Sequence, residues 1–325
     1  MIRLSFIGCG AFARRYHLPV LYQSMDVSVG VICDPSSAPE LAAAAEALGA
    51  RITDRIEEVW DAAAGDAVII STPHTLHAEQ SRRALNEGKH ILVDKPFVMK
   101  DEDARELSQL ATSLRRVNGV AFNRRFDAAF LRARQIIGEG GIGPVRHVET
   151  VQLGYERAGW FLVPELGGGG PFTGRASHMA DIVPWLLDSP PLEVRGRLRE
   201  GPPGRSDHGG FIDLRFADVD CRMTCIEAGF HMWDEVRIYG ENGLIELRRP
   251  LDLPIGWSLS WVKDREGTAE TMSADATPGA ATLDFLSAVR AATKPACSFA
   301  DARTSVRVVE AAFRSARQGE RWLDL

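Results

Sequence analysis

The sequence lacks the features that mark membrane, secreted and nucleic-acid-binding proteins. It has no run of about 18 apolar residues, the length that a membrane-spanning helix needs. A strand-like pattern begins at the N-terminus, so we expect no signal peptide. Acidic side chains (44) outnumber Lys and Arg (38), and this net charge of −6 argues against nucleic acid as the main partner.

Cysteine is sparse and odd in number, with five residues spread along the chain: Cys9, Cys33, Cys221, Cys225 and Cys297. Such a set indicates reduced thiols and a cytoplasmic protein rather than a disulfide framework. Cys221 and Cys225 lie four positions apart, but no second Cys or His pair follows closely in the sequence. We therefore predict buried core thiols and no metal site.

What the sequence does have is a glycine-rich turn after a short apolar run. Residues 4–13 read Leu-Ser-Phe-Ile-Gly-Cys-Gly-Ala-Phe-Ala, and a helix is expected from Ala11 to Gln23. Where a strand turns sharply into a helix, Gly8 allows the tight turn, Gly10 lets a pyrophosphate approach, and Ala13 allows close packing. The helix N-terminus offers N–H groups and a positive dipole end to phosphates. Such turns also occur without a ligand, so the motif alone leaves both interpretations open.

Asp34 ends the next apolar run, 21 positions after Ala13. A dinucleotide-binding unit places a carboxylate there to accept hydrogen bonds from the adenosine ribose hydroxyls. The alternative is a turn or helix N-cap residue, because Pro35 and Ser36 follow. The carboxylate would repel a 2′-phosphate and no Arg follows it closely, so NAD is preferred, with NADP left open.

Strand–helix alternation continues to Phe122, which is typical of a doubly wound parallel sheet. Buried strands are expected at 67–71 and 90–94, and a sixth strand at 117–122. Ligands bind at the carboxyl ends of such strands, which singles out Ser71-Thr72-Pro73 and Lys95. We therefore predict an α/β fold with an N-terminal Rossmann domain over residues 1–122.

The second part of the chain changes to strands that follow strands. The strand candidates are 145–154, 192–199, 211–216, 221–228, 235–239, 244–248 and 257–262. They predict a C-terminal α+β domain, residues 123–325, with a large, mostly antiparallel open sheet that could serve oligomerisation. Helices near 176–187, 280–292 and 302–317 are expected to cover one face, the last one packing back on the first domain. A sheet with one open face usually finds a partner, so we predict a homodimer or homotetramer.

Lys95 and His178 are the side chains best suited to move a proton. Lys95 directly follows the fifth strand, and Pro96 restricts it to an extended conformation. His178 follows a glycine-rich segment and lies one helical turn before Asp181, which is placed to orient it. The alternatives are a surface lysine and a His–Asp helix pair without a part in chemistry.

Taken together, these motifs resemble the Gfo/Idh/MocA oxidoreductases, the family of glucose–fructose oxidoreductase and inositol dehydrogenase. The segments that carry the resemblance are 8–13, 71–77, 94–96, 123–126, 167–181 and 239–243. The resemblance implies that residues 123–325 form the substrate-binding domain. It also implies hydride transfer between nicotinamide C4 and a carbon of a sugar or cyclitol, with Lys95 and His178 matching the catalytic lysine and histidine. The predicted cofactor-binding residues are Gly8, Gly10, Ala11, Phe12, Ala13, Asp34, Ser71, Thr72, Pro73, His77, Asp94 and Lys95.

One departure from the family pattern falls beside His178. The family commonly places an Asp four residues before the His, and here that position is Gly174, followed by Arg175. We hypothesise that Arg175 binds an anionic substrate group, such as a carboxylate or a nucleotide-sugar phosphate. Alternatively, it points to solvent or pairs with a glutamate. The predicted substrate-binding residues are Arg125, Trp160, Arg175 and Asp181, although tryptophan is more often a core residue.

The leading interpretation is a cytoplasmic NAD(P)-dependent dehydrogenase or reductase that acts on CH–OH groups of a sugar, cyclitol or sugar derivative. A second interpretation, favoured by the missing Asp, is a regulatory protein that binds nucleotide and sugar without turnover. A third is a lyase or glycosidase of the same family, in which transient oxidation and re-reduction consume no cofactor.

Overall fold

The structure is a computed structural model that describes residues 1–36, 38–61, 64–155, 158–227, 232–250, 255–263, 268–275 and 278–325. The chain divides into two compact units. Unit 1 comprises Met1–Asn123 and Pro278–Arg303, and unit 2 comprises Arg124–Thr277 and Thr304–Leu325. The assignment of residues 1–122 to cofactor binding and 123–325 to substrate binding and oligomerisation stays a prediction, as does the packing of the last helix.

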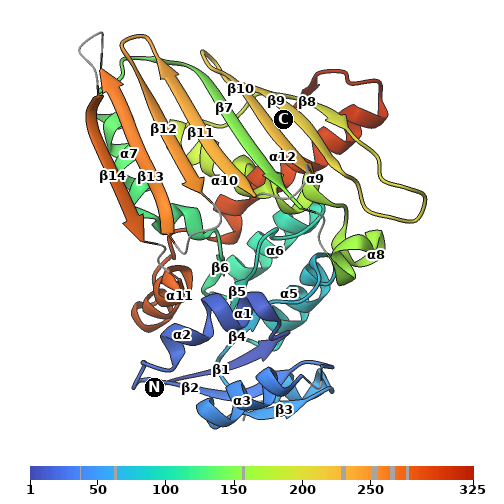
Figure 1. The fold of residues 1–325 in the computed structure, drawn as a ribbon. Coiled ribbons are helices and arrows are strands. Elements are labelled where there is room, and N and C mark those ends of the chain that lie inside the picture. Colours follow the sequence, from blue (N-terminus) through green and yellow to red (C-terminus); the bar gives the residue numbers. More distant parts are fainter. Residues whose placement is uncertain are drawn as a thin grey trace. The chain divides into compact units, whose positions relative to one another are not determined.

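Unit 1 is built on a six-stranded parallel sheet with the strand order β3-β2-β1-β4-β5-β6 (Figure 1). Its strands are β1 (Ile2–Ile7), β2 (Val27–Cys33), β3 (Arg51–Thr53), β4 (Ala67–Ile70), β5 (His90–Val93) and β6 (Asn118–Val120). Its helices are α1 (Ala11–Tyr16), α2 (Leu18–Leu21), α3 (Pro39–Leu48), α4 (Glu57–Trp60), α5 (His77–Asn86), α6 (Asp101–Ser113) and α11 (Ala280–Ala291). The predicted doubly wound Rossmann sheet is confirmed.

The sheet of unit 1 sets where a ligand can bind. All four residues of β4 are buried, as expected for a strand in a parallel sheet that is covered on both faces. The strand order reverses between β1 and β4, and ligands of such sheets bind outside the carboxyl ends at the reversal. Gly8 and Ser71 follow these two strands directly.

The helix expected from Ala11 to Gln23 is interrupted at His17, so that part of the prediction was wrong. The second helix, α2, begins at Leu18 and has Pro19 in its first turn. Proline has no N–H to donate to the preceding helical turn, which explains why α1 ends here.

Unit 2 is built on a nine-stranded sheet with the order β14-β13-β12-β11-β7-β10-β9-β8-β15 (Figure 1). Its strands are β7 (Val145–Gly154), β8 (Glu193–Leu198), β9 (Gly209–Arg215), β10 (Asp220–Glu227), β11 (Trp233–Gly240), β12 (Gly243–Pro250), β13 (Ile255–Lys263), β14 (Thr268–Asp275) and β15 (Leu323–Asp324). Neighbouring strands are antiparallel except β7 and β10, which confirms the predicted, mostly antiparallel sheet. The last residue of the strand predicted at 221–228 lies outside the described residues, and β14 and β15 were not predicted.

Helices cover one face of this sheet: α7 (Ala128–Gly138), α10 (Ala176–Leu187) and the later part of α12 (Phe299–Arg317) (Figure 1). The helix predicted at 280–292 was expected on this face, and that was wrong, because α11 belongs to unit 1 and contacts β5 and β6. The core between them includes Phe130, Met179 and Val308. Two short helices, α8 (Pro164–Gly167) and α9 (Pro171–Gly174), precede α10. The homo-oligomer predicted from the sheet stays a prediction. No helix in the described part of the chain is long and apolar enough to cross a membrane.

Candidate functional site

The glycine turn lies at the reversal point of the unit 1 sheet. Gly8 has a φ of 79°, and a Cβ added to it would lie 2.6 Å from the carbonyl oxygen of Ser71. Position 8 therefore needs glycine, both for its backbone conformation and for its close approach to the next strand end. Gly10 is the N-cap of α1, and among the described residues no heavy atom lies within 4 Å of a Cβ added there.

Asp34 is held beside this turn by two backbone hydrogen bonds. The Cys9 N–H donates to Asp34 Oδ2 at 2.7 Å, and the Ser36 N–H donates to Oδ1 at 2.8 Å. The second bond is that of an Asx turn, as one alternative expected, whereas the N-cap of α3 is Ala38 and not Asp34. A carboxylate has about four acceptor positions, so both oxygens keep capacity for ribose hydroxyls.

These residues fit a dinucleotide cofactor. At Gly8 the turn leaves a narrow space that a Cβ would fill, and beside Gly10 the space is open. Ala13 is fully buried in the first turn of α1, as close helix–strand packing requires, and Phe12 stacks on Tyr16 with ring centroids 4.5 Å apart. Phosphates bind at such turns through backbone N–H groups and the helix dipole.

Asp94 belongs to a buried polar network beside Lys95. His17 Nε2 donates to Asp94 Oδ1 at 2.9 Å, and the Ser71 hydroxyl donates to Oδ2. His17 Nδ1 lies 2.7 Å from the hydroxyl of Thr282, which belongs to α11. The network fixes the strand end from which the half-buried Lys95 extends. His17 was not predicted, because a lone histidine within the helix-compatible segment 11–23 gives no sign of its distant buried partners.

His77 joins the loop after β4 to the segment after β5. Its Nδ1 lies 2.8 Å from the carbonyl oxygen of Pro96, and its Nε2 lies 3.0 Å from that of Thr72. Burial lowers the pKa of His77 below 6.5, although the hydrogen bonds to both carbonyls and the charge of Asp94 oppose this shift. The ring therefore positions loops, and its predicted contact with the cofactor stays a prediction.

The loop after β4 has further internal bonds. The Thr72 hydroxyl donates to Gln80 Oε1 at 2.6 Å, and Pro73 is the N-cap of the short η2 helix, His74–Leu76. Their predicted contacts with the cofactor also stay predictions.

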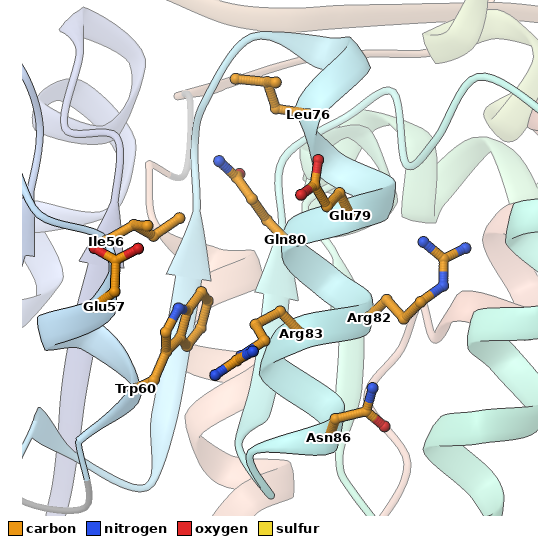
Figure 2. A pocket seen from close by; sticks show the side chains of 9 residues that line it. All are labelled: Ile56, Glu57, Trp60, Leu76, Glu79, Gln80, Arg82, Arg83 and Asn86. Atoms are coloured by element: carbon orange, nitrogen blue, oxygen red, sulfur yellow. The ribbon is translucent and has the colours of Figure 1, made fainter.

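A pocket of about 540 Å³ lies between α4 and α5, beside this loop (Figure 2). Its lining residues, none of which was predicted, are Ile56, Glu57, Trp60, Leu76, Glu79, Gln80, Arg82, Arg83 and Asn86. Arg82 turns away toward α6, where its Nε donates to Glu106 Oε1 at 2.7 Å (Figure 2). Gln80 connects the pocket wall to Thr72.

In unit 2, two of the predicted substrate-binding residues bind each other. Arg125 Nη2 donates to Asp181 Oδ1 at 2.6 Å, and Arg125 Nε donates to Oδ2 at 3.0 Å. Both side chains are buried, so this is a bidentate internal ion pair. The geometry engages both oxygens of Asp181, and a role of either residue in substrate binding stays a prediction.

Arg175 and His178 lie one helical turn apart at the start of α10, where the His178 N–H donates to the Arg175 carbonyl at 3.1 Å. Arg175 is 4% exposed, so it does not point to solvent, whereas His178 is half-buried. The half-buried Trp160 belongs to the η4 helix (Gly159–Leu162) and stacks on Phe161 with ring centroids 3.7 Å apart.

All five cysteines are buried free thiols, which confirms the burial predicted for Cys221 and Cys225. Burial, together with the charge of Asp34, raises the pKa of Cys9 to about 11, and burial raises that of Cys225 to about 12. Within the described ranges no three His, Cys, Asp or Glu side chains gather where they could hold a metal ion.

Comparisons with known proteins identify a family for each part of the chain. Residues 2–122 match the family described as "Oxidoreductase family, NAD-binding Rossmann fold", and residues 130–246 match the GFO/IDH/MocA C-terminal domain. The uncharacterized oxidoreductase YdgJ of Escherichia coli strain K12 is 34% identical over 46% of this chain and 42% of its own length. The 1,5-anhydro-D-fructose reductase of Ensifer adhaerens is 32% identical over 60% of this chain and 59% of its own length. The matched segments thus span less than two thirds of these relatives.

Among solved structures, a 3-ketoreductase from Actinomadura kijaniata, in complex with NADP and TDP-benzene, has the same fold. The TM-score is 0.86 at 21% sequence identity, and the alignment covers 97% of each chain. At this identity the likeness concerns the fold alone.

Proposed function

Because the chain belongs to the Gfo/Idh/MocA oxidoreductase family, we propose that it transfers a hydride between a nicotinamide cofactor and a carbon of a sugar, cyclitol or sugar derivative. The observation that carries this proposal is the glycine turn at the sheet reversal, with Gly8 against Ser71 and Asp34 beside it. A 1,5-anhydro-D-fructose reductase among the relatives supports a sugar-like substrate.

Residues of this chain would accept or donate the hydroxyl proton of the substrate while the hydride is transferred. When bound, the cofactor accepts or supplies a hydride at nicotinamide C4. In oxidation, the substrate C–H and O–H bonds break, a C=O bond forms, and the hydroxyl proton needs an acceptor. Lys95, which extends from the end of β5, is the first candidate for this acceptor, and His178 at the start of α10 is the second. In reduction, the same group returns the proton.

NAD is the proposed cofactor in preference to NADP. The Asp34 carboxylate keeps acceptor positions that suit two ribose hydroxyls and would repel a 2′-phosphate. Replacement of Asp34 by Ala is expected to weaken NADH binding at least tenfold and NADPH binding much less. Titration of nicotinamide fluorescence measures both affinities, and an equal loss for the two cofactors would contradict the assignment.

The decisive test follows nicotinamide absorbance with NAD⁺ or NADP⁺ over a panel of sugars, cyclitols and their acids and phosphates. We expect turnover with at least one substrate, and Lys95→Met to lower it by about a hundredfold or more while NADH still binds. Lys100→Met is the matched control, since Lys100 is exposed at the start of α6. Cofactor binding without any redox change would favour the regulatory interpretation, and turnover without net cofactor change would favour the lyase or glycosidase.

A further inference from the structure

Three arginines are buried in the described part of unit 2, and two of them have buried carboxylate partners. Arg124, 7% exposed, pairs with Asp234 at 3.2 Å, and Arg125, 9% exposed, pairs with Asp181 at 2.6 Å. This is the ordinary state of a buried guanidinium, because an ion removed from water needs a counter-charge and hydrogen-bond acceptors.

Arg175 is the third and differs from the other two. Its Nη2 donates one long hydrogen bond, 3.3 Å, to the carbonyl oxygen of Tyr155. Its Nε is buried and has no hydrogen-bond partner among the described residues, and no described carboxylate lies within 4.0 Å of the guanidinium. The most deeply buried guanidinium of unit 2 therefore faces no counter-charge in the described structure.

The described groups that, like Arg175, lie close enough to Cys225 to influence its thiol make no ion pair with Arg175. Cys225, on the neighbouring strand β10, is a neutral thiol, because burial raises its pKa to about 12. Asp234 accepts from Arg124 and from Gln152 Nε2. Asp207 accepts the backbone N–H groups of residues 170, 172 and 209. Both carboxylates near Cys225 thus accept hydrogen bonds from donors other than Arg175.

Gly154, at the end of β7, makes room for the guanidinium. A Cβ added there would lie 2.3 Å from Arg175 Nη2 and 2.6 Å from Cζ. The guanidinium thus approaches the backbone of a strand end at a place where any larger residue would displace it. A preorganised Arg fork matches the planar oxygens of carboxylate and phosphate groups.

We propose that Arg175 forms an anion-binding subsite, and that the substrate is a sugar or cyclitol derivative that carries a carboxylate or a phosphate. This inference rests on the proposed function, because it places the anionic group of the substrate one helical turn from His178, the second candidate proton acceptor. A neutral substrate would leave the buried charge of Arg175 uncompensated.

The test compares D-glucose with D-glucuronate and D-glucose 6-phosphate in isothermal titration calorimetry, in the presence of NADH. We expect at least one of the two anionic sugars to bind tenfold or more tightly than glucose, and the one preferred identifies a carboxylate or a phosphate as the anion. Arg175→Gln should remove this preference, while Arg205→Gln, which changes an exposed arginine of the same unit, should keep it.

Gly154→Ala is the second variant, because it keeps the charge and displaces the guanidinium, and it should also lose the preference. The proposal is overturned if Arg175→Gln and Gly154→Ala keep the preference for the anionic sugar, or if no anionic sugar binds more tightly than glucose. It is also overturned if the preference appears only after Glu156→Gln, because a glutamate of the chain would then be the carboxylate that pairs with Arg175. Glu156 lies outside the described residues.

The two proposals can fail separately. If anionic sugars bind through Arg175 but none changes nicotinamide absorbance, the subsite is supported and the hydride-transfer function is refuted. If neutral sugars are oxidised with the same kcat/KM by the wild type and Arg175→Gln, the function is supported and the anionic substrate class is refuted.

Discussion

Arg125 and Arg175 allow a direct test of how a buried charge with and without a described carboxylate partner affects the stability of unit 2. Both side chains are less than a tenth exposed, but Arg125 holds Asp181 through two hydrogen bonds, whereas Arg175 holds one backbone carbonyl at 3.3 Å. Replacing each by Met removes the charge and keeps an unbranched apolar chain in its place. The two variants should therefore change the free energy of unfolding in different ways.

Arg125→Met leaves the Asp181 carboxylate buried without its bidentate partner. Breaking a buried ion pair on one side costs about 3–5 kcal/mol. For a folded unit of this size, each kcal/mol lowers Tm by about 2–4 °C, so unit 2 should melt about 6–20 °C lower. Arg175→Met instead loses one weak hydrogen bond, worth about 0.5–1.5 kcal/mol, and removes a buried charge that no described carboxylate pairs with, whose burial costs several kcal/mol.

We therefore expect Arg175→Met to be as stable as the wild type or more stable in the absence of anions. The assay is thermal and urea unfolding followed by circular dichroism in Tris chloride, free of phosphate and carboxylate buffers. A loss of stability in Arg175→Met as large as that in Arg125→Met would refute the reasoning, because it would mean that the chain itself supplies a counter-charge to Arg175.

Three further predictions concern the turn, a buried histidine and the thiols. Gly8→Ala places a Cβ 2.6 Å from the Ser71 carbonyl at a φ of 79°, so urea unfolding should show a loss of about 1–3 kcal/mol, and an unchanged midpoint would contradict the strain. Burial lowers the pKa of His77, so folding favours its neutral form, and stability is lost as pH falls from 6.5 toward the lower folded value. His77→Gln should show a smaller loss over that range in unfolding experiments at several pH values; an equal loss would assign the effect to other groups. The five buried thiols should resist iodoacetamide at neutral pH until urea unfolds the chain, and one fast-reacting thiol in the folded protein would disprove their burial.

Local patterns predicted those parts of the fold whose residues carry their own signal. The apolar run of β4 and the glycine turn at Gly8 indicated a buried strand and a sharp turn, and the structure has both. The strand β14 was missed because residues 268–275 are mostly polar and become a strand through pairing with β13 at the sheet edge. The residues of the segment itself show no pattern that would predict this pairing.

The candidate site was harder to predict because its contacts join distant parts of the sequence. His17 meets Thr282, which is 265 residues away, and Arg125 meets Asp181, which is 56 residues away. In the sequence, Arg125 and Arg175 look alike, and neither suggests which one has a carboxylate partner. That difference comes from tertiary packing, in which Gly154 leaves space for one guanidinium.

Unit 1 is completed by residues 278–303, which follow most of unit 2 in the sequence, and this affects its folding during synthesis and the fragments that can fold alone. The Val120 N–H donates to the Cys297 carbonyl at 2.9 Å, and the Phe299 N–H donates to Asn118 Oδ1 at 2.9 Å, so β6 is completed by a late segment. During translation, unit 1 cannot finish packing until nearly the whole chain has left the ribosome. A fragment that stops at residue 123 would expose the surface that α11 covers. A circularly permuted unit 1, in which residues 278–303 are joined to Met1 and the chain ends at Asn123, would carry every part of the unit.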